Sequence, residues 1–191
     1  MDASVFRLCN DAPEPILPLQ VAVSFQNAGT RSIHEKLPTA VSVFPLFHVQ
    51  TVTLYWEDED DLASYDRDLW TRCFGDAREL RTVRTLKGTV RQLIHALRPL
   101  QSDLSRVFAP SLTRIEMRDV SFCKPCRSSN TEGSCARCVR CLQDTLVRRS
   151  ESGYPIAELM ITRCRGIHSA DVKMLEGVVV IVVVFECKIR G

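Results

Sequence analysis

The chain contains little glycine and few lysines, and it has no long apolar run. Its 191 residues include 8 Gly, 5 Lys and 20 Arg. Neither G-x-x-x-x-G-K-[ST] nor G-x-G-x-x-G occurs in it, so the sequence offers no loop of the kinds that cradle phosphates. The longest apolar run, Val178 to Phe185, is much shorter than the ~20 residues of a membrane-spanning helix. We therefore expect no nucleotide-binding loop and no membrane partner.

Catalytic and secretory signals are missing as well. The N-terminal residues Met1 to Ser4 do not begin a basic segment followed by an apolar one, which a signal peptide would have. Nine cysteines, an odd number, then indicate reduced thiols rather than a disulfide framework. The histidines lie in no metal-binding or catalytic motif: they are His34, His48, His95 and His168. We predict a non-enzymatic protein of the cytoplasm or nucleus.

The charges nearly balance, with 25 basic and 23 acidic residues and a net charge of +2. A general nucleic-acid binder usually has a larger basic excess, so we do not expect nucleic acid as the main partner. The arginine bias suits protein interfaces, because guanidinium groups make bidentate contacts and stack on aromatic rings. The acidic run Glu57 to Asp61 lacks the alternating spacing and glycine of a calcium loop. We interpret it as a solvated loop with a helix cap.

A short pattern, apolar-x-x-apolar-x-apolar, recurs along the chain. Strong copies begin at Val49, Leu112 and Ile156, and weaker ones at Ile16 and Leu80. The middle residues of the five copies are 19, 52, 83, 115 and 159, so the steps are 33, 31, 32 and 44. A near-constant step predicts repeated structural units. The longest step contains a Cys-rich insertion at 121–141.

Each copy of the pattern resembles a strand, and a helix-like stretch follows it. We predict these helices within residues 29–41, 60–77, 88–100, 134–153 and 168–178. This order fits either a leucine-rich-repeat-like solenoid or a doubly wound parallel sheet. Strands of a doubly wound sheet are buried on both faces, whereas Thr53 and Tyr55 alternate here with Val52 and Leu54.

The alternation favours an α/β fold with an irregular leucine-rich-repeat-like solenoid, parallel strands on one face and helices on the other. We expect residues 1–15 to be an N-terminal tail and residues 16–191 to form one repeat domain of about five strand-helix units. The last run, Gly177 to Phe185, does not alternate. It predicts a terminal strand covered on both faces, or an aggregation-prone strand if it is exposed.

The outward residues of neighbouring strands in a solenoid form one concave surface. Tyrosine and arginine are enriched among the residues that dominate binding energy. We therefore predict a protein or peptide ligand on this concave face. The partner-binding candidates are Tyr55, Arg84, Arg114, Glu116, Arg118 and Glu158.

The Cys-rich insertion contains two C-x-x-C pairs separated by eight residues. Four thiolates in two such pairs can hold zinc in a tetrahedral structural site, and the metal would fix an otherwise polar segment. The metal candidates are Cys123, Cys126, Cys135 and Cys138, with Cys141 as a spare thiol. The other interpretation, which we favour, has no cofactor, because the spacer is short and cysteines also pack as small apolar groups.

Three segments together carry a family resemblance: "FPLFHVQTVTLYW", "FAPSLTRIEMRDVSFC" and "LVRRSESGYPIAELMITRCRGIHSADVKMLEGVVVIV". Over about residues 38 to 185, the chain resembles the leucine-rich-repeat-like region of fungal (basidiomycete) F-box proteins. The resemblance implies the substrate-recognition part of a ubiquitin-ligase receptor. An F-box, which docks a Skp-type adaptor, is not found in this sequence. The segment Glu35 to Val41 contains Leu-Pro but lacks the rest of that motif.

Coupling to a ubiquitin-ligase adaptor is therefore not supported by this chain alone. Two alternatives remain open beside a protein-interaction module. One is a zinc-stabilised adaptor whose Arg-rich insertion contacts nucleic acid, and the other is a truncated remnant without independent activity.

Overall fold

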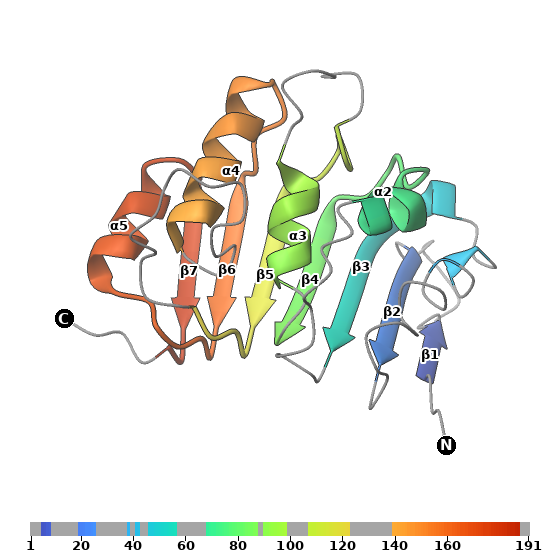
Figure 1. The fold of residues 1–191 in the computed structure, drawn as a ribbon, viewed down its shortest axis with the longest axis horizontal. Coiled ribbons are helices and arrows are strands. Elements are labelled where there is room, and N and C mark those ends of the chain that lie inside the picture. The colour runs from blue at the N-terminus through green and yellow to red at the C-terminus, as the bar shows by residue number, and fades with distance from the viewer. Residues whose placement is uncertain are drawn as a thin grey trace, which may run out of the picture.

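The computed structural model of the chain describes residues 5–8, 19–25, 38, 41–42, 46–56, 68–87, 90–98, 107–122 and 139–187. They form an α/β fold around one open sheet of seven strands (Figure 1). The strands are β1 (Val5–Leu8), β2 (Leu19–Phe25), β3 (Val49–Trp56), β4 (Thr82–Lys87), β5 (Arg114–Arg118), β6 (Glu158–Thr162) and β7 (Ile181–Phe185). The helices are η1 (Leu46–His48), α2 (Asp68–Phe74), α3 (Val90–Leu97), α4 (Val139–Glu151) and α5 (Ser169–Glu176).

The strands lie in the sheet in the order in which they occur in the chain. Strands β2 to β7 are parallel, and β1 pairs with β2 in the antiparallel direction. Helices α2 to α5 all lie on the same side of the sheet in Figure 1. A doubly wound sheet reverses its strand order at a switch point, and strands β1 to β7 contain no such reversal. The described strands therefore do not form the doubly wound alternative.

The apolar residues of the repeated pattern form the core between the sheet and the helices. The middle residues Val52, Val83, Ile115 and Leu159 lie opposite one another in successive strands, and each is 0% exposed. Burying a side chain of this size contributes roughly 1.5–3 kcal/mol. Alternation along each strand puts these residues on the helix side, because successive side chains of a strand point to opposite faces.

The helices close this core with side chains spaced at helical intervals. Predicted helical residues Leu93 and Leu97 of α3 and Leu142 and Leu146 of α4 are buried. Helix α2 lies in the C-terminal half of the predicted stretch 60–77. The predicted helix at 29–41 falls almost entirely outside the described residues, and the acidic run Glu57 to Asp61 lies wholly outside them.

The N-terminal part of the sheet differs from the expectation in two ways. The structure has strand β1 within residues 1–15, which we assigned to a tail, and this strand pairs along β2. The first copy of the pattern is also displaced, because Val21 rather than Leu19 lies opposite Val52. Leu19 instead lies opposite Val49, next to a register shift between Leu19 and Gln20, and this pairing cannot be read from the spacing of apolar residues.

The last strand is covered on one face only, so the expectation of a strand covered on both faces is wrong. Val182 and Val184 are half-buried on the face that the helices cover. Ile181, Val183 and Phe185 are exposed on the other face. Helix α5 packs against β7, and no described element lies over the opposite face of this strand. The structure therefore matches the exposed alternative.

The ends of the last three strands share one backbone turn. Asp119, Arg163 and Glu186 each follow a strand directly, and their φ angles are 57°, 54° and 55°. Left-handed φ values are uncommon for residues other than glycine. The Asp119 N–H donates to the Thr162 carbonyl, and the Arg163 N–H donates to the Phe185 carbonyl in the same way. The C-terminal units thus repeat in their turns as well as in their apolar residues.

Candidate functional site

The sheet face opposite α2 to α5, here called the outward face, carries three rows of side chains. The strand register aligns Thr51, Thr82, Arg114, Glu158 and Ile181 in the first row, Thr53, Arg84, Glu116, Met160 and Val183 in the second, and Tyr55, Leu86, Arg118, Thr162 and Phe185 in the third. All but Thr51, which is buried, are half-buried or exposed. The structure thus places all six predicted partner-binding residues on one face.

Four of these six residues contact one another in a chain of ion pairs, here called the ion-pair ladder. The Arg84 Nε donates a hydrogen bond to Glu116 Oε2 across 2.7 Å. The Arg114 Nε lies 2.8 Å from Glu116 Oε1, and Arg114 Nη1 lies 3.1 Å from Glu158 Oε2. The ladder therefore links β4, β5 and β6 across the outward face.

The register explains why these charges meet. Arg84 lies directly opposite Glu116, and Arg114 lies directly opposite Glu158. Opposite charges at such cross-strand positions stabilise a sheet by roughly 0.2–1 kcal/mol for each pair. Glu116 lies within ion-pair distance of both arginines, and its side chain is 17% exposed. Arg114 Nε and Glu116 Oε1 are close but are not aligned as a hydrogen bond, so that contact is electrostatic.

The ladder holds its arginines in place without presenting a net charge. Two guanidinium groups and two carboxylates cancel. The Arg84 side chain is nevertheless 40% exposed, and a guanidinium has five N–H donors in a rigid fork. The ladder can therefore still donate hydrogen bonds to a ligand from preorganised positions.

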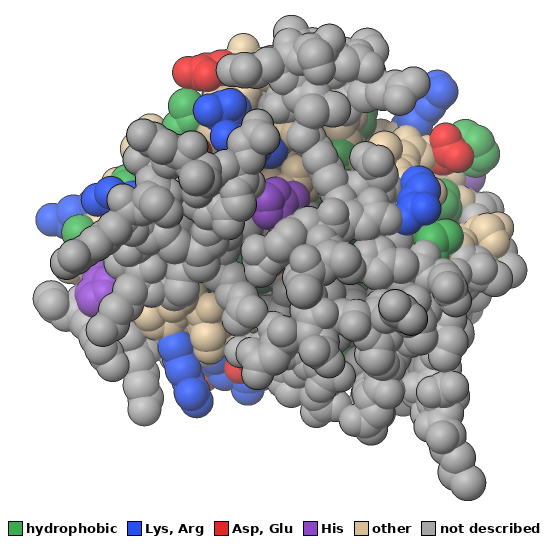
Figure 2. Space-filling view, in the orientation of Figure 1, with side chains coloured by type: hydrophobic (Ala, Val, Ile, Leu, Met, Phe, Trp, Pro, Cys, Tyr) green, Lys and Arg blue, Asp and Glu red, His purple; other side chains and the backbone are tan. Residues whose placement is uncertain are grey.

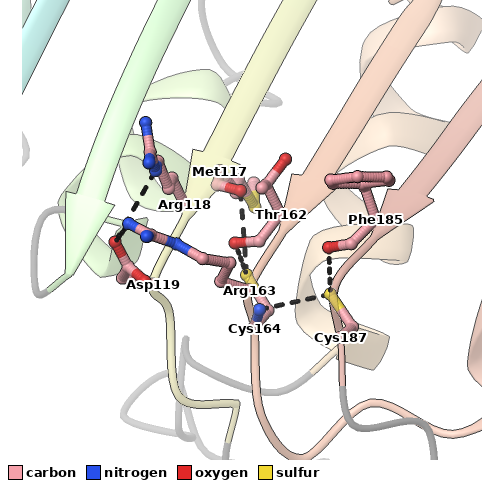
Figure 3. Close-up of polar contacts among 8 residues, drawn as sticks. All are labelled: Met117, Arg118, Asp119, Thr162, Arg163, Cys164, Phe185 and Cys187. Atoms are coloured by element: carbon pink, nitrogen blue, oxygen red, sulfur yellow. Dashed lines mark hydrogen bonds and ion pairs between the residues drawn. The ribbon is translucent and has the colours of Figure 1, made fainter.

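The two other predicted residues border the ladder. Arg118 lies at the end of β5, with Nε 3.8 Å from Asp119 Oδ2, and Arg163 Nη2 approaches the same carboxylate oxygen at 2.5 Å (Figure 3). Tyr55 lies in the same row as Arg118, and Leu86 is between them. Both residues thus lie in the row next to the one that contains Arg84 and Glu116.

An apolar strip adjoins the ladder, and our sequence reasoning did not include it among the site residues. Ile181, Val183 and Phe185 of β7, here called the apolar edge, are 50%, 37% and 60% exposed. Met160 of β6 is half-buried beside Val183. The unbroken apolar run contained this signal, but its missing alternation hid which residues face outward.

Two cysteines that our sequence reasoning did not single out occupy equivalent places after β6 and β7 (Figure 3). Cys164 Sγ lies within hydrogen-bond distance of the carbonyls of Met117 and Thr162, and Cys187 Sγ lies within hydrogen-bond distance of those of Ile161 and Phe185. The Cys164 N–H in turn donates to Cys187 Sγ at 3.2 Å. Burial raises the pKa of the Cys164 thiol to about 12. Cys164 is therefore a neutral thiol, and the two cysteines, here called the cysteine ladder, connect successive strand ends.

The sequence signal for the cysteine ladder is its spacing. Cys164 follows Ile161, the last apolar residue of the fifth pattern copy, by three positions, and Cys187 follows Val184 of β7 by the same distance. Leucine-rich repeats have an asparagine or cysteine at this place. After β5 the equivalent residue is the buried Val120.

A buried arginine connects α4 with the segment before β5. Arg149 is 0% exposed, and its Nη1 and Nη2 donate to the carbonyls of Phe108 and Ala109 at 2.8 and 2.5 Å. Burial lowers the pKa of Arg149 to about 10, and nearby Tyr154 opposes this shift. Arg149 lies in α4, on the helix side of the sheet, so we interpret it as a structural clamp that holds α4 to the segment before β5.

The predicted metal ligands Cys123, Cys126, Cys135 and Cys138 lie outside the described residues, and Cys141 is half-buried in α4. Within the described ranges, no group of three or more His, Cys, Asp or Glu side chains could hold a metal ion. No helix in the described part of the chain is long and apolar enough to cross a membrane. On the helix side, the described Lys and Arg side chains are scattered rather than gathered (Figure 2).

The chain was compared with protein-family models, curated proteins and solved structures. No protein-family model matches the chain, and no curated protein or solved structure matches it either.

Proposed function

We propose that the chain is a non-catalytic protein-interaction module that binds a protein or peptide on its outward face. The observation that carries this proposal is the junction of the ion-pair ladder with the apolar edge. Binding surfaces commonly combine an apolar centre with arginine and aromatic residues that are already held in place. The ladder supplies two oriented guanidinium groups, and Val183 and Phe185 supply apolar surface beside them.

The architecture we propose is an irregular solenoid of the leucine-rich-repeat type. The sequential parallel order of β2 to β7 supports it, because stacked strand-helix units produce that order. The shared turns at Asp119, Arg163 and Glu186 support it further, as does the cysteine ladder at the place where leucine-rich repeats have asparagine or cysteine. In this architecture the outward face is the strand-lined binding surface.

The resemblance to fungal F-box proteins suggests a more specific role, and we include it in the proposal. The module would hold the target of a ubiquitin ligase, as the corresponding region of those receptors does. Its ligand would carry hydrogen-bond acceptors for Arg84 and Arg114 and an apolar side chain for the surface around Met160. Because the ladder has no net charge, we expect binding to depend only weakly on salt.

The test is a pair of double variants in the full chain. Arg84→Ala/Arg114→Ala removes both guanidinium groups of the ladder, and Arg78→Ala/Arg140→Ala removes two exposed arginines outside the outward face. Partners are captured with the unmodified chain, and their dissociation constants are then measured with each folded variant. We expect the ladder variant to weaken the relevant partner at least about tenfold, equivalent to ~1.4 kcal/mol. If every captured partner binds both variants equally well, the outward face is not the binding site.

A further inference from the structure

Strand β7 ends the sheet with a backbone edge that no described strand covers. Ile181 N–H donates to the Ala157 carbonyl, and the Phe185 carbonyl accepts from Arg163 N–H. In a parallel sheet, the N–H and C=O groups of one residue both point to the same neighbouring strand, and those of the next residue point to the opposite side. Residues 181, 183 and 185 therefore face β6, and the N–H and C=O groups of Val182 and Val184 face away from the sheet.

This edge lacks the features that usually keep exposed strands apart. Natural edge strands are protected by charged side chains, prolines, bulges or very short length. The segment Ile181 to Phe185 contains neither charge nor proline, and its register with β6 is regular over all five residues. Its three outward side chains are exposed and apolar. The edge is therefore open to another strand.

We propose that β7 pairs in the antiparallel direction with β7 of a second copy of this chain, about a two-fold axis at Val183. In this register Val182 of one copy lies opposite Val184 of the other. The backbone groups of both residues point away from β6 and towards the second copy, so the two pairs form four N–H···O=C bonds. A two-fold axis of this kind makes the interface self-complementary and stops assembly at two copies.

The same register also brings the exposed side chains into contact with one another. Ile181 of each copy lies beside Phe185 of the other, and the two Val183 side chains meet at the axis. Such a central pair lies between hydrogen-bonded pairs, where the Cα atoms are only about 4.5 Å apart and side chains are closest. Because β7 carries no charge, identical strands do not repel each other. A partner strand with charged residues would lose this match, which is why we favour a second copy.

The interface involves one short strand from each chain, so we expect a reversible dimer rather than an obligate one. It also extends the outward face, since a two-fold axis perpendicular to the sheet keeps both outward faces on the same side. The proposal does not depend on what the ion-pair ladder binds.

The first experiment measures the mass of the full chain by analytical ultracentrifugation over a concentration series under reducing conditions. The variant Val183→Lys places two like charges directly opposite each other, and we expect it to raise the dimer dissociation constant several-fold, because like charges at such positions destabilise a strand pair. The matched control is Thr53→Lys, because Thr53 lies in the same outward row but in β3. A parent chain that stays monomeric, or a dimer unaffected by Val183→Lys, would overturn the proposal.

The second experiment tests the register and does not require a destabilising charge. Under mild oxidation, Val183→Cys should form a disulfide between two copies, since the expected Cα separation lies within the range of disulfides. The yield is counted above that of the parent chain, and the crosslinked peptide is identified by mass spectrometry. Thr53→Cys is the control. Equal yields from the two variants, or crosslinking only in large polymers, would contradict the two-fold pairing.

Discussion

Replacing Gly166 with alanine tests the turn that joins β6 to the segment after β5. Gly166 has φ +74°, and an added methyl group would meet the carbonyl oxygen of Phe122. Two backbone hydrogen bonds of 2.9 Å hold this turn, from Arg165 N–H to the Val120 carbonyl and from Phe122 N–H to the Arg165 carbonyl. The substitution therefore has to move backbone that is already hydrogen-bonded.

Gly153 provides the matched control. Its φ is +87°, but an added methyl group there meets nothing within 4 Å. A left-handed conformation costs an alanine roughly 1–2 kcal/mol. The smaller entropy of the unfolded alanine chain offsets roughly 0.4–1 kcal/mol of this. We expect Gly153→Ala to lower the free energy of unfolding by about 1 kcal/mol.

Gly166→Ala adds the loss of the two hydrogen bonds, at about 1 kcal/mol each, so its total loss should be about 3 kcal/mol. Urea unfolding followed by circular dichroism, in reducing buffer, measures both variants against the parent chain. Equal stability of the two variants would refute the reasoning, because the close approach to Phe122 would then cost nothing.

Three further predictions concern buried or paired polar groups. Arg149→Met leaves two buried carbonyls without their donor, so thermal and urea unfolding should show a loss of about 2–4 kcal/mol; an unchanged or more stable variant would contradict the clamp. The raised pKa of Cys164 means that the folded state favours the protonated thiol, so the stability from this thiol is fully present below pH 9.0 and is lost as the pH rises towards about 12. The urea midpoint should therefore fall more steeply in the parent than in Cys164→Ala between pH 8.5 and 10, roughly the onset of thiol ionisation. Parallel curves for the two proteins would contradict the raised pKa. A double-mutant cycle of Arg84→Ala and Glu116→Ala should give a coupling free energy of about 0.5–1 kcal/mol that shrinks with salt, whereas strictly additive effects would show that the pair is energetically silent.

The sequence predicts the core well because the relevant signal is local. A strand with alternating side chains needs only a few residues to show which of them are buried, and Val52, Val83, Ile115 and Leu159 are all buried as expected. The same alternation put Arg84, Arg114 and Glu116 on the opposite face. The face of a side chain follows from parity along its own strand, whatever the neighbouring strands do.

Contacts between strands were harder to predict because they depend on register. Arg84 and Glu116 each follow the middle residue of their pattern by one position, so alignment of the copies would have paired them. The same alignment fails for β2, where Val21 rather than Leu19 is the partner of Val52 and Leu19 lies opposite Val49. Strand β1 was missed because a four-residue strand without a repeat partner leaves no periodic signal.

The outward exposure of β7 could not be predicted because every residue from Val178 to Phe185 is apolar. In such a run parity defines two faces but does not say which one a helix covers. The structure answers this through α5, which packs against β7 and leaves Val182 and Val184 half-buried. Sequence alone therefore located the strand but not its exposed face.

The position of the apolar edge gives the outward face two separable functions. A ligand on the ion-pair ladder would contact side chains of β4, β5 and β6, whereas a second copy would pair with backbone groups of Val182 and Val184 in β7. Met160 lies between these regions, in the same row as Glu116 and Val183. If a second copy pairs at β7, the side chains of the apolar edge are flanked by their copies in the partner, and Met160 is the apolar residue next to the ladder. Substituting Val183 should then alter self-association first, and substituting Arg84 and Arg114 should alter ligand binding first.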